Sequence, residues 1–309
     1  MLKQKRFLIP VIALYAAIIT VMIMTAINPA FDFEVSFRLT SGGAVTYTIG
    51  NILEIWAEPV PLIPLCFIMA MAAVCAVRTK YKNKLPQILG GALMIGGAVL
   101  SYQIVERIVK YYCKLEDITA PWIVKEGTYA SSLWWVKAIC AAAGVLIMFL
   151  FVYLSLKIDQ ERLKRAQRVM IFAVVSLLLE LAIVEGMKMI FGRMRFREWL
   201  QNPTNVYDFP WYKINGKPAS DAFKSFPSGH TASAFLIMPV TFMFDAFGRE
   251  KAGRIARIVH LCWVATVMVS RIMAGAHFLS DVCGGLFVSL TIVTVTGAIL
   301  FRDGKIRKE

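Results

Sequence analysis

Two of the chain's three histidines stand in short polar strings that interrupt long apolar sequence. Residues 226–230 read FPSGH and end on His230, while His277 follows Arg271 by six positions and precedes Asp281 by four. Polar groups beside membrane-length apolar runs are costly, so they are retained where they have a use. Two imidazoles, a carboxylate and a guanidinium in such strings therefore predict a reaction centre.

The basic and small residues near these strings suit a phosphate group. Lys188 and Arg195 are separated by six residues, and Arg271 adds a third cation. Guanidinium groups match phosphate oxygens in bidentate fashion. Ser228 and Gly229 are typical of a helix start, where a hydroxyl, unpaired amides and the helix dipole favour an anion.

The pair His277 and Asp281 suits nucleophilic chemistry. Residues four apart on a helix share a face, so the carboxylate can hold the imidazole in one tautomer. The other ring nitrogen is then free to attack a phosphorus atom.

The elements that must position these residues are apolar helices. Hydrophobic residues make up 58% of the 309 and come in blocks, and about 20 helical residues span a hydrocarbon core. We predict an all-α fold, a polytopic integral membrane helix bundle with about eight transmembrane helices. The apolar runs are residues 7–27, 59–77, 85–104, 133–156, 169–187, 229–247, 254–270 and 279–301.

The positive charge lies mainly on one side of this predicted bundle. With a cytoplasmic amino terminus, the inner segments hold more than half of the 34 Lys and Arg residues and account for the formal net charge of +14. This positive-inside pattern explains the basic balance without a nucleic-acid partner. We therefore expect a multi-pass protein of the plasma (inner) membrane with both termini cytoplasmic. All candidate residues then fall at helix ends on the periplasmic or extracellular side.

Two long outer segments, 28–58 and 105–132, mix aromatic, acidic and aliphatic residues. Each is expected to contain a short helix on the membrane surface. We expect residues 1–84 to form an N-terminal transmembrane hairpin with an outer segment, and residues 85–309 to form a six-helix core.

The polar strings resemble the three signature motifs of the type 2 phosphatidic acid phosphatase family, also called the lipid phosphate phosphatases. The resemblance implies that His277 is the nucleophile that forms a phosphohistidine, that Asp281 orients it, and that His230 protonates the leaving oxygen. It also implies that residues 85–309 are the family's lipid phosphatase core. The residues that it implies hold the phosphoryl oxygens are Lys188, Arg195, Ser228, Gly229 and Arg271.

One position departs from the family pattern. The first motif usually continues from its arginine into proline, whereas Phe196 follows Arg195 here. Since that proline shapes the loop and binds nothing, we expect activity to be retained. Arg193 or Arg197 can share the role given to Arg195.

The implied reaction is hydrolysis of a phosphomonoester or pyrophosphate on a membrane lipid, with no metal and no cofactor. A site at the membrane surface suits a lipid whose tail stays in the bilayer. Isoprenyl pyrophosphates, phosphatidylglycerol phosphate and phosphatidate all fit. The sequence leaves protein partners unknown.

Each residue also has a plainer interpretation. His277 with Asp281 can be a structural pair, His230 can simply begin a helix, and the basic residues of 188–197 can bind lipid headgroups.

Other functions use the same residues differently. A lipid phosphotransferase would share the histidine intermediate, and a transporter or scaffold would hold phosphate without catalysis. Vanadium haloperoxidases share the pocket but are soluble enzymes. Glu180 and Glu185 lie in apolar sequence and suit structural pairing or a proton path.

Overall fold

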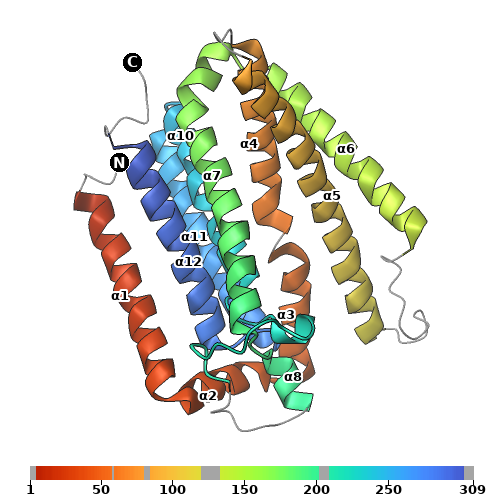
Figure 1. Cartoon of the computed structure of the whole chain (residues 1–309), viewed down its shortest axis with the longest axis vertical. Helices are drawn as coiled ribbons and strands as arrows, with labels where there is room; N and C mark the ends of the chain where they lie inside the picture. Colours follow the sequence, from red (N-terminus) through yellow and green to blue (C-terminus); the bar gives the residue numbers. More distant parts are fainter. Residues whose placement is uncertain (1–4, 58, 80–83, 120–132, 202–208, 303–309) are drawn as a thin grey trace. The chain divides into compact units, whose positions relative to one another are not determined.

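The chain folds into helices joined by turns and loops (Figure 1). This computed structural model describes residues 5–57, 59–79, 84–119, 133–201 and 209–302, and none of these residues is in a β-strand. The predicted all-α class is confirmed. The α-helices are α1 (Lys5–Ile27), α2 (Pro29–Thr40), α3 (Gly43–Ala57), α4 (Pro59–Arg78), α5 (Leu85–Thr119), α6 (Trp134–Leu156), α7 (Gln160–Phe191), α8 (Phe196–Gln201), α9 (Gly229–Phe235), α10 (Ile237–Ala246), α11 (Glu250–Met273) and α12 (Leu279–Leu300).

Seven segments of the described residues are long and apolar enough to cross a membrane. They correspond to seven of the eight predicted apolar runs, so the prediction of a polytopic membrane bundle is confirmed. The segments are Ile9–Ile27, Thr48–Arg78, Leu85–Tyr112, Trp134–Leu156, Gln160–Gln201, Glu250–Met273 and Leu279–Leu300.

The apolar run 229–247 differs from the prediction. It forms two helices, because α9 ends at Phe235 and α10 begins at Ile237. Pro239 explains the interruption, since a proline ring clashes with the carbonyl group four residues earlier. That carbonyl belongs to Phe235, the last residue of α9.

The outer segments also contain helices. Residues 28–58 hold α2 and α3, as expected, whereas α5 continues through the start of the second segment to Thr119. Residues 120–132 lie outside the described part of the chain. The placement of these segments on a membrane surface remains a prediction.

The described helices form two compact units. Unit 1 draws on residues 1–54, 176–236 and 259–304, and unit 2 draws on residues 55–175 and 237–258. Every candidate site residue belongs to unit 1. The predicted boundary between residues 84 and 85 remains a prediction.

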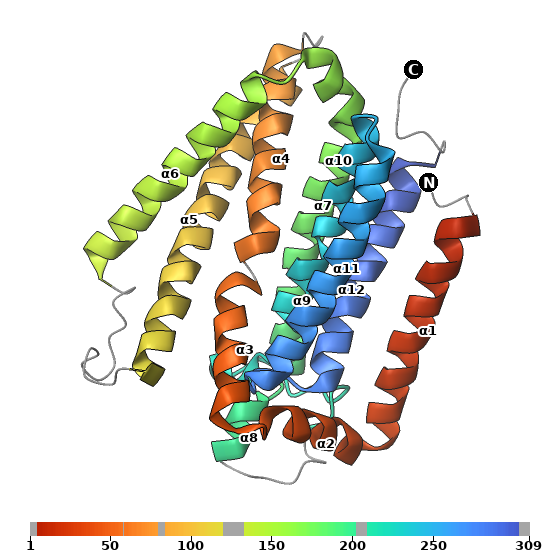
Figure 2. The same cartoon turned by 180° about the vertical axis from the view of Figure 1, so that it is seen from behind.

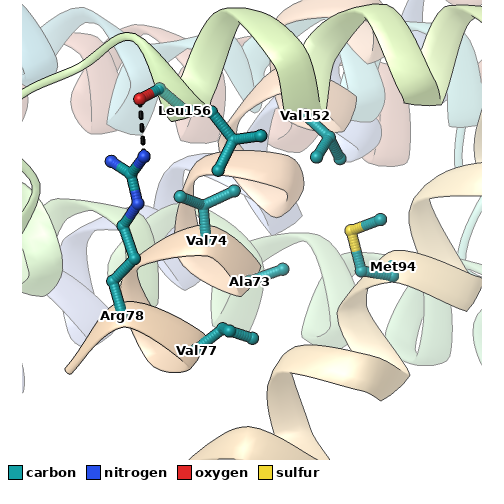
Figure 3. Close-up of a pocket in the computed structure, with 7 residues that line it drawn as sticks. All are labelled: Ala73, Val74, Val77, Arg78, Met94, Val152 and Leu156. Atoms are coloured by element: carbon teal, nitrogen blue, oxygen red, sulfur yellow. Dashed lines mark hydrogen bonds between the residues drawn. The ribbon is translucent and has the colours of Figure 1, made fainter. Parts of the chain in front are cut away.

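In unit 2, α4, α5 and α6 pack closely together. A Cβ atom on Gly144 of α6 would lie 2.6 Å from the Tyr102 nitrogen of α5, so glycine permits this approach. Arg78 donates hydrogen bonds to the carbonyl oxygens of Leu156, at 2.7 Å, and Ile158, at 3.2 Å. A cation at these terminal carbonyls stabilises the end of α6. An apolar cleft beside this contact is lined by Ala73, Val74, Val77, Arg78, Met94, Val152 and Leu156 (Figure 3).

In unit 1, α1 lies beside α12 (Figures 1 and 2). The Tyr15 hydroxyl donates to Thr291 Oγ1 at 3.1 Å, and its ring meets that of Phe287 edge to face at 5.7 Å. Buried Tyr hydroxyls usually find such a partner. The N-terminal helix is thus attached to the helix that carries Asp281.

Two glycines of α12 let the FPSGH string lie directly on that helix. A Cβ atom on Gly285 would come within 2.3 Å of the Ser228 carbonyl oxygen, and one on Gly284 would come within 2.5 Å of the Phe226 ring. Neither neighbour could move away cheaply, because one is backbone and the other is a buried ring. The small residues of α12 therefore bring two of the predicted motifs together.

Candidate active site

His277 and Asp281 meet at the start of α12. His277 Nδ1 lies 3.6 Å from Asp281 Oδ2, a separation slightly longer than a hydrogen bond. Ser225 Oγ lies beside both groups, because it donates to Asp281 Oδ2 at 2.5 Å and is 3.5 Å from His277 Nδ1. The carboxylate and the hydroxyl both face Nδ1. Nε2 is therefore the ring nitrogen available to a substrate.

The reason for this approach differs from the prediction. His277 precedes α12 rather than sharing one of its faces, since the helix has Phe278 as its N-cap and begins at Leu279. Asp281 Oδ2 accepts a hydrogen bond from the Phe278 backbone nitrogen at 2.8 Å. This capping turn, rather than helical periodicity, brings the carboxylate back toward the imidazole.

Burial keeps the His277 imidazole neutral. The residue is only 2% exposed, and this loss of solvation lowers its pKa from 6.5 to about 4, against the opposing attraction of Asp281. The positive charges of Arg195 and Arg271 lower the pKa further. A neutral imidazole retains the lone pair that nucleophilic attack requires.

Arg193 holds the other side of Asp281. Its Nη1 donates to Asp281 Oδ1 at 2.6 Å and to Ser280 Oγ at 2.7 Å, while Nη2 donates to Asp32 Oδ2 at 2.8 Å. Its Nε donates to the carbonyl oxygen of Phe209 at 2.9 Å. All three nitrogens of this buried guanidinium are thus engaged with protein acceptors.

The FPSGH string lies across the same helix start. The Ser228 backbone nitrogen donates to the Asp281 carbonyl oxygen at 2.9 Å, and Ser228 Oγ accepts from the Thr231 nitrogen at 3.4 Å as the N-cap of α9. A Cβ atom on Gly229 would lie 3.0 Å from Lys188 Nζ. Glycine therefore leaves room for the lysine from α7 to reach the start of α9.

The two histidines come from adjacent helix starts. His230 lies in the first turn of α9, which packs along α12, and His277 precedes the first turn of α12. The bond between Ser228 and Asp281 joins these two starts. His230 is half-buried, whereas His277 is almost completely enclosed.

Two of the three candidate cations pair with exposed carboxylates. Lys188 Nζ lies 2.6 Å from Glu185 Oε1, and Arg195 Nη2 lies 2.9 Å from Asp221 Oδ2. The carboxylate side chains are 58% and 74% exposed, respectively. Because these carboxylates are open to water, solvent screens their attraction to the two cations. A phosphate group can therefore replace these carboxylates at little cost.

Arg271 is different, because its guanidinium is fully enclosed. Its Nη2 donates to Glu54 Oε1 at 3.0 Å, but Nε and Nη1 are buried and have no hydrogen-bond partner among the described residues. Leaving one such donor unsatisfied costs about 1–3 kcal/mol, so native proteins seldom do so without a use. Each of these two unpaired cationic donors can serve an oxygen of an anion.

Residues 169–305 match the family described as the PAP2 superfamily. This segment contains every candidate catalytic and phosphate-binding residue. The chain carries a PAP2 superfamily domain. The predicted relationship to the type 2 phosphatidic acid phosphatases is thereby confirmed. Asp32 and Glu54, which contact this PAP2 domain, both lie before the matched segment.

The chain is also similar to a named protein. The chain is 29% identical over 124 residues to a protein described as lipid A 1-phosphatase from Rhizobium johnstonii (strain DSM 114642 / LMG 32736 / 3841). The alignment covers 40% of this chain and 44% of that protein, so it spans less than half of the relative's length. No solved structure gives a significant match.

Four residues of this site were not assigned these positions from the sequence. Ser225, Arg193, Asp32 and Glu54 each contact a predicted site residue or its immediate neighbour. Ser225 directly precedes the FPSGH string, so its position was a usable signal. The two acidic residues, Asp32 and Glu54, lie in the outer segment 28–58, where no motif or spacing in the sequence names a partner.

Proposed function

We propose that the chain is a membrane-embedded lipid phosphate phosphatase that hydrolyses a phosphomonoester or pyrophosphate on a membrane lipid. The observation that carries this proposal is Arg271, whose two enclosed and unpaired guanidinium nitrogens lie in the same unit as a neutral His277 braced by Asp281. The PAP2 domain match supports the same reaction class.

In the first step, Nε2 of His277 attacks the phosphorus atom while the bond to the lipid oxygen breaks. Lys188, Arg195 and Arg271 neutralise charge on the equatorial oxygens, which is the largest expected contribution to catalysis of phosphoryl transfer. His230 donates a proton to the departing lipid oxygen. The products are the dephosphorylated lipid, or the lipid monophosphate, and a phosphohistidine.

In the second step, water attacks the phosphohistidine. His230, now neutral, accepts a proton from that water as the new oxygen–phosphorus bond forms. The phosphorus–nitrogen bond breaks, and its electron pair returns to Nε2. Inorganic phosphate leaves, and His230 is protonated again for the next lipid.

The substrate class is proposed from the membrane setting and the relative's name. Lipid A 1-phosphate joins isoprenyl pyrophosphate, phosphatidylglycerol phosphate and phosphatidate as a candidate. The positive-inside distribution supports a site on the periplasmic or extracellular side of the plasma (inner) membrane.

The test is phosphate release by the purified, detergent-solubilised chain from each of these four lipids. We expect at least one lipid to give multiple turnovers, with the dephosphorylated lipid seen by thin-layer chromatography. A labelled phosphate that appears only on an added acceptor lipid would instead identify a phosphotransferase. Stoichiometric binding without release from any lipid would support the non-catalytic alternative.

The lowered pKa of His277 predicts an unusual acid limb. The pH dependence of kcat/KM reports the pKa values of the free enzyme. After correction for substrate ionisation, kcat/KM should stay constant from pH 7 to about 5 and fall only near the His277 pKa of about 4. In the unfolded chain His277 binds a proton near pH 6.5, whereas in the folded protein it does so only near pH 4. The free energy of unfolding therefore falls as the pH drops from about 6.5 to about 4. Each acidic sample is therefore returned to pH 7 and assayed again, so that unfolding is distinguished from protonation of His277. A fully reversible tenfold fall per pH unit that begins at 6.5 would contradict a neutral, buried nucleophile.

Turnover is expected to be independent of divalent ions. A metal ion would offset the negative charge of the phosphoryl oxygens, and we assign this task to Lys188, Arg195 and Arg271. Dialysis against EDTA should leave the rate unchanged on the best lipid of the panel. A loss of turnover that added Mg²⁺ or Zn²⁺ restores would contradict this mechanism.

A further inference from the structure

Three polar residues of α2 face the turn between α11 and α12. Asp32, Ser36 and Thr40 are spaced by four, so they form one stripe along the helix. Thr40 Oγ1 donates to the Ile272 carbonyl oxygen at 2.9 Å, near the end of α11, and Ser36 Oγ accepts from the Leu279 nitrogen at 3.1 Å. The stripe thus contacts both sides of the turn that carries His277.

Asp32 makes the most contacts of this stripe. Its Oδ1 accepts from the Ser280 backbone nitrogen at 2.8 Å, and its Oδ2 accepts from Ser280 Oγ at 2.5 Å. Figure 2 shows α2 lying across the start of α12.

These contacts replace the usual cap of α12. The first amides of a helix have no partner within it, and a Ser, Thr, Asp or Asn at the N-cap normally satisfies one of them. Here the N-cap is Phe278, so α2 supplies acceptors to the amides of Leu279 and Ser280. A carboxylate at a helix N-terminus is also favoured by the helix dipole.

Asp32 is also the far end of a buried chain of charges. Its Oδ2 lies 2.8 Å from Arg193 Nη2, and Arg193 Nη1 lies 2.6 Å from Asp281 Oδ1. The side chains of Asp32 and Arg193 are each 3% exposed, and that of Asp281 is not exposed at all. Because Arg193 is fixed between two carboxylates, it holds Oδ1 of Asp281 and leaves Oδ2 facing His277.

We infer that Asp32 is a positioning residue for the nucleophile, supplied from outside the matched PAP2 segment. It acts through Arg193 and through the backbone of α12, and it touches neither the substrate nor His277. This inference rests on the proposed function. In addition to its predicted place at the membrane surface, α2 then helps to set the orientation of the His277 imidazole for attack.

The test compares two isosteric changes on the same helix. Asp32→Asn removes the charge that faces Arg193, whereas Glu34→Gln removes one negative charge from the exposed side of α2, where Glu34 pairs only with Arg38 in the described contacts. Asp32→Asn is expected to lower kcat about 10- to 100-fold through small displacement of the nucleophile, with KM little changed. Glu34→Gln should behave as the unmodified protein.

Two inhibitors separate positioning from general damage to the fold. Inorganic phosphate binds the cations without attack by His277, so its inhibition constant should be unchanged in Asp32→Asn. Vanadate takes up a five-coordinate geometry that includes the nucleophile, so its inhibition constant should rise in proportion to the loss of kcat/KM. Parallel weakening of both inhibitors would overturn the inference in favour of a purely structural role.

A second variant keeps the inference testable if Asp32→Asn fails to fold. The double change Ser36→Ala with Thr40→Val removes the neutral contacts to the turn and leaves the Asp32–Arg193 pair intact. We expect it to lower kcat about 2- to 10-fold with the same inhibitor pattern, because neutral hydrogen bonds contribute less than charged ones. Unchanged kcat in this double variant would overturn the part of the inference that acts through the backbone of α12, and unchanged kcat in a folded Asp32→Asn protein would overturn it entirely.

The outcome for His277 separates this inference from the proposed function. If His277→Ala is inactive and Asp32→Asn is fully active, only the positioning role is wrong. If His277→Ala keeps full activity, the proposed mechanism itself fails.

Discussion

Replacing His277 with alanine is expected to lower lipid phosphate hydrolysis by at least about 10³-fold, because no other group can form the covalent intermediate. The variant should still fold, since loss of a neutral side chain leaves Asp281 paired with Arg193 and Ser225. The measurement is phosphate release from the best lipid of the panel, with size-exclusion chromatography to check the fold.

The matched control is His260→Ala. His260 is also buried, at 4% exposure against 2% for His277, and it packs on Phe235 of α9 without a place in the proposed chemistry. This control should retain activity. Equal losses in the two variants would mean that any missing buried imidazole damages the protein, and the nucleophile assignment would then have no support.

A trapping experiment sharpens the same prediction. With a labelled substrate that has a good leaving group, His230→Ala should still be phosphorylated but should lose the label slowly, because water is no longer activated. The label should survive alkali and be released by acid, as expected for phosphohistidine. The double variant His230→Ala with His277→Ala should carry no label.

The second large effect is expected at Arg271. Arg271→Met removes the two unpaired nitrogens that we assign to the phosphoryl oxygens, and loss of such transition-state donors costs about 10²- to 10³-fold in rate. It also leaves the Glu54 carboxylate without this buried partner, which costs about 3–5 kcal/mol of stability. The single variant is therefore expected to be both inactive and less stable.

A double variant separates these two effects. Arg271→Met with Glu54→Gln removes both charges of the pair, so thermal stability should recover toward that of the unmodified chain. Activity should not recover. If hydrolysis returned with stability, Arg271 would serve only as the structural partner of Glu54 and the phosphate site would have to lie elsewhere.

The helices themselves could be predicted from local sequence. Apolar runs of about 20 residues indicate membrane-length helices because the bilayer sets that length, and seven of the eight runs have counterparts among the candidate spans. The break between α9 and α10 was missed although Pro239 stood in the sequence. Hydropathy records how apolar a run is, not whether its backbone is continuous.

The candidate chemistry was likewise visible in residue types. His230, His277, Asp281 and the three cations could be selected because they stand in short motifs whose residue types and spacing suit phosphate chemistry. The geometry of the pair His277 and Asp281 could not be predicted in this way. It comes from the capping turn before α12 rather than from a shared helix face.

By itself, therefore, the sequence determined the helical membrane class and the candidate reactive groups, because both are recorded in composition and short-range spacing. Only the tertiary structure decided which acids brace those groups. Glu54 is 217 residues from Arg271, and Asp32 is 248 from Ser280. Contacts over such separations leave no periodic mark in the chain, since they depend on how α2 and α3 pack against the ends of α11 and α12.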